Sequence, residues 1–73
     1  MKVCKVLMVW DDGAWCAKTD EEIGLTLESG SFDALIERVR SALPELLELN
    51  CGYTGQIQIV FETQRVDTMR AVG

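Results

Sequence analysis

The sequence predicts an α+β domain with the element order β-β-β-α-β, in which an antiparallel sheet carries one helix on one face. Three observations predict this fold. An apolar stretch near the amino-terminal end alternates as a strand does and runs into an Asp-Gly turn. A longer segment repeats its apolar residues every three or four positions, as a helix does. A further segment alternates again and shows the clearest strand pattern of the chain.

The first predicted strand spans residues 3–10 and is apolar on both of its faces. The two sets of side chains are Cys4, Val6, Met8 and Trp10 on one face, and Val3, Lys5, Leu7 and Val9 on the other. A strand with two apolar faces is typical of a position that is covered on both sides. Because a single helix covers only one face, we expect a dimer or a larger homo-oligomer.

A hairpin is predicted after this strand. Asp12-Gly13 is a dipeptide that readily adopts the positive φ angles of a two-residue type I′ turn, which also explains the acidic residues there by turn chemistry. The residues placed opposite each other would be Trp10 with Trp15, and Met8 with Ala17. The second and third strands are predicted at residues 14–19 and 25–28.

A helix is predicted after the third strand. Ser31 is placed to cap its amino terminus, and Asp33 lies near the positive end of its dipole. Pro44 removes one backbone donor inside the pattern, so we expect a kink or two short helices there. Asn50 and Gly52 are expected to end the helix. Its core-facing stripe consists of Phe32, Leu35, Ile36, Val39, Leu43 and Leu46.

The last strand is predicted at residues 56–65, with its alternate apolar residues pointing inward. Residues 1–65 then form a single domain, and residues 66–73 form an edge extension or a flexible tail. A chain of 73 residues buries only about 60% of its unfolded surface. One core of this size supplies roughly 3–5 kcal/mol of stability. We expect a second subunit to supply additional stability.

The composition limits the partners. Seven Lys and Arg against twelve Asp and Glu give a net charge of −5, so we expect no direct nucleic-acid binding, which needs clustered positive charge. A basic protein partner fits this charge. No apolar stretch approaches the roughly 20 residues of a membrane span, and no signal peptide is recognisable. We therefore expect a cytoplasmic protein with reduced thiols and no membrane contact.

Taken together, these motifs resemble a known family over roughly residues 1–65. The matching motifs, in order, are Trp10-Asp11, Trp15-Cys16-Ala17, Gly24-Leu25, Ser29-Gly30-Ser31, Leu35-Ile36-Glu37-Arg38-Val39 and the stretch 43–50. This combination resembles the HicB-type antitoxin N-terminal domain, and above all its short, stand-alone relatives gathered as a domain family of unknown function.

The resemblance implies a self-associating β-β-β-α-β domain, often described as a partial ribonuclease H fold. In the antitoxins this domain also covers a small basic messenger-RNA-cleaving toxin, so a HicA-like toxin is a possible type of partner. The family's usual Pro-x-x-Pro-Gly segment is absent, because residues 20–24 contain no proline. The chain stops at Gly73, before the DNA-binding domain that such antitoxins normally carry, so DNA binding and operon autoregulation are not expected.

The resemblance also raises the question of metal-dependent catalysis. Two-metal chemistry needs carboxylates that converge on ions about 3.5–4 Å apart. In the predicted hairpin Asp11 and Asp12 lie at the turn, whereas residues 20–22 lie at the opposite end of the second strand. The three Cys have no His to activate them, and no Cys-x-x-Cys pair is present. We therefore expect no catalytic residues, no metal and no cofactor.

Three functions remain open: a non-catalytic HicB-like interaction module, a metal-dependent ribonuclease H-like nuclease, and a structural assembly subunit. For the interaction module, two sets of residues are candidates. The set predicted to bind a basic partner is Asp20, Glu21, Glu22 and Glu62. The set predicted for self-association is Val6, Met8, Trp10 and Trp15.

Overall fold

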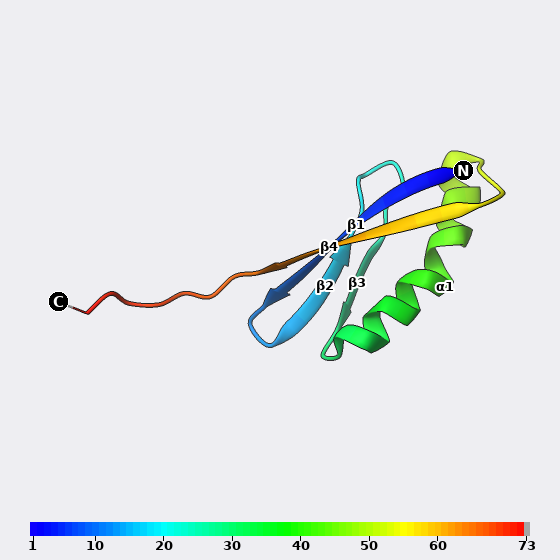
Figure 1. Cartoon of the computed structure of the whole chain (residues 1–73). Helices are drawn as coiled ribbons and strands as arrows, with labels where there is room; N and C mark the ends of the chain where they lie inside the picture. The colour runs from blue at the N-terminus through cyan, green and yellow to red at the C-terminus, as the bar shows by residue number, and fades with distance from the viewer. Residues whose placement is uncertain (73) are drawn as a thin grey trace.

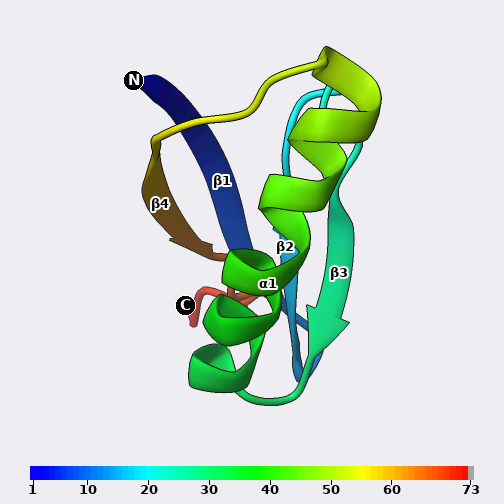
Figure 2. The ribbon, with the colours of Figure 1, turned by 90° about the vertical axis from the view of Figure 1, so that its right-hand side faces the viewer.

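The computed structural model describes residues 1–72 and confirms the predicted order of three strands, a helix and a strand (Figure 1). One four-stranded sheet has the strand order β3-β2-β1-β4, and the helix packs against one face of it (Figure 2). The α+β fold class is therefore confirmed. The elements are β1 (Lys2–Asp11), β2 (Ala14–Lys18), β3 (Thr26–Ser29), α1 (Phe32–Cys51) and β4 (Ile57–Arg65).

The sheet is mixed, so the prediction of an antiparallel sheet was wrong. β2 pairs antiparallel with β1 and with β3, but β4 pairs parallel with β1 from Lys2↔Ile57 to Trp10↔Arg65. The physical reason is the return path of the chain. Helix α1 carries the chain back along the sheet after β3, as a crossover between parallel strands requires, so β4 starts at the end where β1 starts.

The predicted hairpin is confirmed in register and in turn geometry. Trp10 lies opposite Trp15, and Met8 lies opposite Ala17. The turn dipeptide Asp12-Gly13 has φ angles of 51° and 83°, which are the positive values that a type I′ turn needs.

Helix α1 begins and ends at the predicted signals. The hydroxyl of Ser31 accepts a hydrogen bond from the N–H of Ala34 at 3.3 Å, and Asp33 lies in the first turn. Gly52 follows the helix with a left-handed φ of 64°, and its N–H donates to the carbonyl of Glu48.

Pro44 lies inside one continuous helix of 20 residues, so the alternative of two short helices was wrong. Leu43 and Leu47 flank this proline and are both fully buried. Packing of an apolar helix face supplies most of a helix's stability in a protein, and here it outweighs the one backbone hydrogen bond that the proline removes.

The core lies between α1 and the face of the sheet that it covers. Leu47 is fully buried, whereas the predicted core residue Leu46 is only partly buried, so the helix presents a slightly different stripe from the one expected. The buried apolar residues are Cys4, Val6, Met8, Ala17, Ile23, Leu25, Leu35, Val39, Leu43 and Leu47.

The second face of the sheet has no helix over it, and we call it the open face. Within one protomer β1 is therefore covered on one side only. Val3, Leu7 and Val60 on this face are 54%, 37% and 38% exposed. Strand alternation and register assign to it Val3, Lys5, Leu7, Val9, Asp11, Ala14, Cys16, Lys18, Thr26, Glu28, Gln58, Val60, Glu62 and Gln64.

Residues 66–72, which we call the arm, extend away from the body of the domain beyond β4 (Figure 1). The N–H of Val66 still donates to the carbonyl of Trp10 at 3.4 Å, and no helix or strand is assigned to the rest of the arm. Met69 and Val72 are 89% and 101% exposed. The predicted tail of residues 66–73 includes Gly73, which lies outside the described residues.

Candidate functional site

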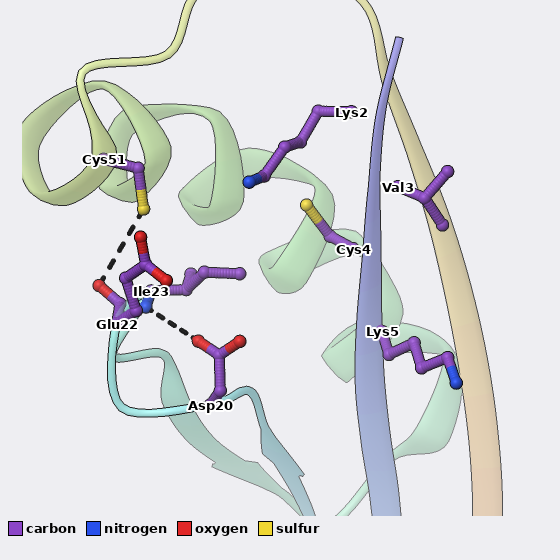
Figure 3. A pocket seen from close by; sticks show the side chains of 8 residues that line it. All are labelled: Lys2, Val3, Cys4, Lys5, Asp20, Glu22, Ile23 and Cys51. Atoms are coloured by element: carbon purple, nitrogen blue, oxygen red, sulfur yellow. Dashed lines mark hydrogen bonds between the residues drawn. The ribbon is translucent and has the colours of Figure 1, made fainter.

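A cavity opens where β1 loses its pairing with β2. The two strands pair only from Leu7↔Lys18 to Asp11↔Ala14. After β2 the chain turns away into the loop 19–25, so the part of β1 from Lys2 to Val6 pairs with β4 on one edge and with no described strand on the other. The resulting cavity of about 430 Å³, which we call the notch, lies between β1 and this loop (Figure 3).

The notch has charged rims and an apolar floor. The side chain of Lys2 reaches from β1 into the notch, and the carboxylates of Asp20 and Glu22 lie on the loop opposite (Figure 3). Cys4 and Ile23 form the floor and are 2% and 6% exposed. An extended segment placed here would therefore meet a strand edge, an apolar base and charges of both signs.

The loop 19–25 is held by its own hydrogen bonds. A carboxylate oxygen of Asp20 accepts from the N–H of Ile23 at 2.9 Å, and the carbonyl of Asp20 accepts from the N–H of Gly24 at 2.9 Å. At the end of α1 the amide of Asn50 donates to the carbonyl of Ile23 at 2.8 Å. Asp20 is thus a turn-forming residue in addition to being a surface charge.

The four carboxylates predicted for a basic partner are divided between two places. Glu21 and Glu22 are exposed on the loop, and neither forms an ion pair within residues 1–72. Glu62 lies on the open face instead, with its carboxylate 3.9 Å from the ammonium of Lys5. The loop therefore offers two unpaired carboxylates beside the notch, whereas Glu62 is balanced by a lysine.

The four residues predicted for self-association all lie on the helix-covered face. Val6 and Met8 are fully buried inside the protomer, which corrects their assignment to a surface for a second copy. Trp10 and Trp15 are half-buried with ring centroids 5.3 Å apart, and Trp15 meets Phe32 of α1 edge-on at 4.8 Å. The assignment failed because the hairpin pattern does not show which of two apolar faces the helix covers.

The Cys4 thiol on the floor of the notch is not activated. Burial raises the pKa of the Cys4 thiol, nearby Asp20 and Cys51 raise it further, and Lys2 acts in the opposite direction. Because the thiolate is the reactive form, a thiol with a raised pKa is a poor nucleophile.

The carboxylates of the hairpin lie far from those of the loop. The register places Asp11 opposite Ala14 at the turn, while Asp20 follows the other end of β2. In the described part of the chain, no group of three or more His, Cys, Asp or Glu is arranged to hold a metal ion.

Among the described residues, no helix is both long and apolar enough to cross a membrane.

Several parts of this site were not identified from the sequence. Lys2, Asn50 and Cys51 gave no local signal of a place at the notch, because that place depends on the distant segments that meet there. Ile23 did give a local signal, because it is the single large apolar side chain in the polar stretch 19–24. Such a residue is typically buried and fixes its loop to the core.

Together these features define a small α+β domain with a mixed sheet, one covered face and a notch in its central strand. The chain belongs to the family described as "Domain of unknown function (DUF1902)", whose model matches residues 3–72. This confirms the part of the resemblance that pointed to a domain family of unknown function.

The chain is also similar to a solved structure. The crystal structure of hypothetical protein TTHA1013, from the extremely thermophilic bacterium Thermus thermophilus, is 28% identical in sequence and superposes with a TM-score of 0.74. The match covers 93% of this chain and 100% of that chain. No curated protein matches this sequence.

Proposed function

We propose that the protein is a non-catalytic, self-associating protein-interaction module, similar in role to the N-terminal domain of HicB-type antitoxins. The observation that carries the proposal is the open face. Val60 is paired with Lys5, between Val3 and Leu7 on the neighbouring strand, so the three apolar side chains surround one lysine. Clustered apolar side chains on an otherwise polar surface are typical of an interaction site.

The charges of the open face favour a second copy of the same chain as the occupant. Two lysines, Lys5 and Lys18, stand against three carboxylates on this face, so both signs of charge are present, although the whole chain has a net charge of −5. The three carboxylates are those of Asp11, Glu28 and Glu62. A copy related by a two-fold axis presents the same patch and can place its lysines over these glutamates. A strongly basic partner would gain no comparable advantage on this face.

Replacing Leu7 with lysine is expected to convert the oligomer into a monomer in sedimentation velocity at micromolar concentration. The change replaces one of the three apolar side chains of the patch with a second charge that must be desolvated on association, and this cost opposes association. Val60→Lys should act in the same way. The matched control is Leu49→Lys, because Leu49 is 79% exposed on α1. A wild-type protein that sediments as a monomer at this concentration would contradict the proposal.

A small basic protein is the second partner that we propose, and the loop beside the notch is its docking place. Glu21 and Glu22 are exposed carboxylates without an ion-pair partner in residues 1–72, and they favour this role. Complementary charge raises association rates and selects among partners. HicB-type antitoxins cover partners of this chemistry, so a small basic protein of the HicA-like type is the partner to measure.

The double reversal Glu21→Lys/Glu22→Lys should slow association with that basic protein. The rate for the wild type should also fall as salt rises, because the screening length shrinks from about 10 Å at 0.1 M to about 3 Å at 1 M. The matched control is Glu45→Lys/Glu48→Lys, which makes the same change of charge at exposed positions of α1. Stopped-flow rates that are equal for the two double variants would rule out the loop as the docking place.

A further inference from the structure

We propose that the arm of one copy enters the notch of a second copy and adds a strand to the free edge of its β1. The inference rests on the proposed self-association, and it names the segment that is exchanged and the place that receives it.

The free edge of β1 offers backbone groups for an incoming strand. The N–H of Lys2 donates to the carbonyl of Gln56 on the β4 side. Backbone groups of successive residues point to opposite edges of a strand, so Val3 and Lys5 direct their N–H and C=O groups toward the notch. Within the described residues no strand pairs with β1 on that edge. Strand addition would supply the missing partners, as in other complexes in which a peptide extends a sheet.

The arm has the properties of a strand that lacks a partner. It continues the direction of β4 (Figure 1), and its apolar Met69 lies between the polar Thr68 and Arg70. Met69 and Val72 are almost completely exposed. The family model extends to residue 72, so the arm is a part of the domain that this family shares.

The arm cannot lie along the notch of its own chain. Arg65 pairs with Trp10, so the arm begins at one end of β1, while the notch lies along Lys2–Val6 at the other end. The distance back to the middle of the notch is about 20 Å at roughly 3.3 Å per residue. Seven residues span at most about 25 Å, so after a reversal of direction too few residues would remain to form a strand there.

A second copy brings its notch within reach of the arm. In a two-fold pair whose strands run antiparallel, the Arg65 end of one sheet lies over the Lys2 end of the other. Stacked sheets lie about 10 Å apart, which is well within the span of the arm. Both arms are exchanged at once, because the two-fold axis relates the two notches.

One side of the arm matches the floor of the notch. On one side of an added strand, Met69 would lie over the apolar floor formed by Cys4 and Ile23. On the other side, Arg70 would point the same way as Val3 and Lys5, toward the open face (Figure 3).

A disulfide between the arm and the notch tests the proposal directly. The variant Met69→Cys, oxidised by air with copper phenanthroline, should form linked dimers in which the introduced thiol is joined to Cys51 or Cys4, the two thiols that line the notch. Peptide mapping by mass spectrometry identifies the bond. The control Leu49→Cys introduces a thiol at a site 79% exposed and measures random collisions. We expect at least ten-fold faster linkage for Met69→Cys, and its loss when Cys4→Ser and Cys51→Ser are added together.

Linkage no faster than that of Leu49→Cys would overturn the proposal. Linkage to Cys16 would also overturn it, because Cys16 belongs to the open face and the arm would then lie there. A second measurement needs no cysteine chemistry: the amides of Val3 and Lys5 should exchange hydrogen at least ten-fold more slowly in the wild type than in Met69→Asp. An oligomer in which these amides remain unprotected would refute arm exchange alone, whereas a monomeric wild type would refute self-association as well.

Discussion

Replacing Met8 with alanine is expected to unfold most of the protein, and not only to separate its subunits. Met8 is fully buried on β1, lies opposite Ala17 and belongs to the core cluster that includes the buried residues of α1. Such a truncation costs about 2–5 kcal/mol, through lost burial and the cavity that remains. A single core of this size supplies only roughly 3–5 kcal/mol. Urea unfolding followed by circular dichroism, at one fixed protein concentration, measures the loss.

The neighbouring residue provides the control for this prediction. Leu7 belongs to the same strand but lies on the open face, where it is 37% exposed. Leu7→Ala should reduce the free energy of unfolding by less than half of the loss in Met8→Ala, and should act mainly on the oligomeric state. A Met8→Ala protein that dissociates but keeps a wild-type unfolding midpoint as a monomer would show that Met8 belongs to a subunit interface.

Replacing Ile23 with alanine is expected to cost a free energy in the lower half of the same range of about 2–5 kcal/mol. Ile23 is 6% exposed, and its backbone is held by Asp20 on one side and by Asn50 on the other. Removing its side chain opens the floor of the notch and releases the loop 19–25 from the core. Thermal unfolding gives the loss of stability, and faster amide exchange at Gly24 and Leu25 would report the loosened loop.

Glu22→Ala is the matched control for Ile23→Ala, since it truncates the adjacent side chain in the same loop. Glu22 is exposed and has no ion-pair partner within residues 1–72, so the change should stay within about 0.5 kcal/mol. Equal losses for the two variants would mean that the loop is held by its charges and not by Ile23.

The parts of the fold that depend on neighbouring residues could be predicted from the sequence. Asp12-Gly13 determined the hairpin register, since only a two-residue turn places Trp10 opposite Trp15. Ser31 and Gly52 marked the ends of α1 through backbone groups within one turn of the helix. These signals act over a few residues, and tertiary packing did not change them.

The direction of β4 and the position of the notch could not be predicted in the same way. Alternation in residues 56–65 shows which side chains share a face, but not whether the neighbouring strand runs parallel or antiparallel. The notch exists because β2 ends at Lys18 while β1 continues along β4 back to Lys2, so it depends on two pairings at once. Pro44 shows the opposite error. A local rule predicted a kink or two short helices, and the packing of Leu43 and Leu47 rules out the second alternative.

The parallel pairing of β1 with β4 has a consequence for the way the protein is made. A ribosome releases β1 first, but the strand that covers its long edge is the last element to emerge. Until then the nascent chain can form only the hairpin and the helix, and the apolar β1 remains open along an edge on which another chain could pair. Closing so long a loop is slow compared with forming a hairpin. We therefore expect folding to be completed only after synthesis has passed Arg65, with the nascent hairpin as the species most prone to aggregate and most in need of a chaperone.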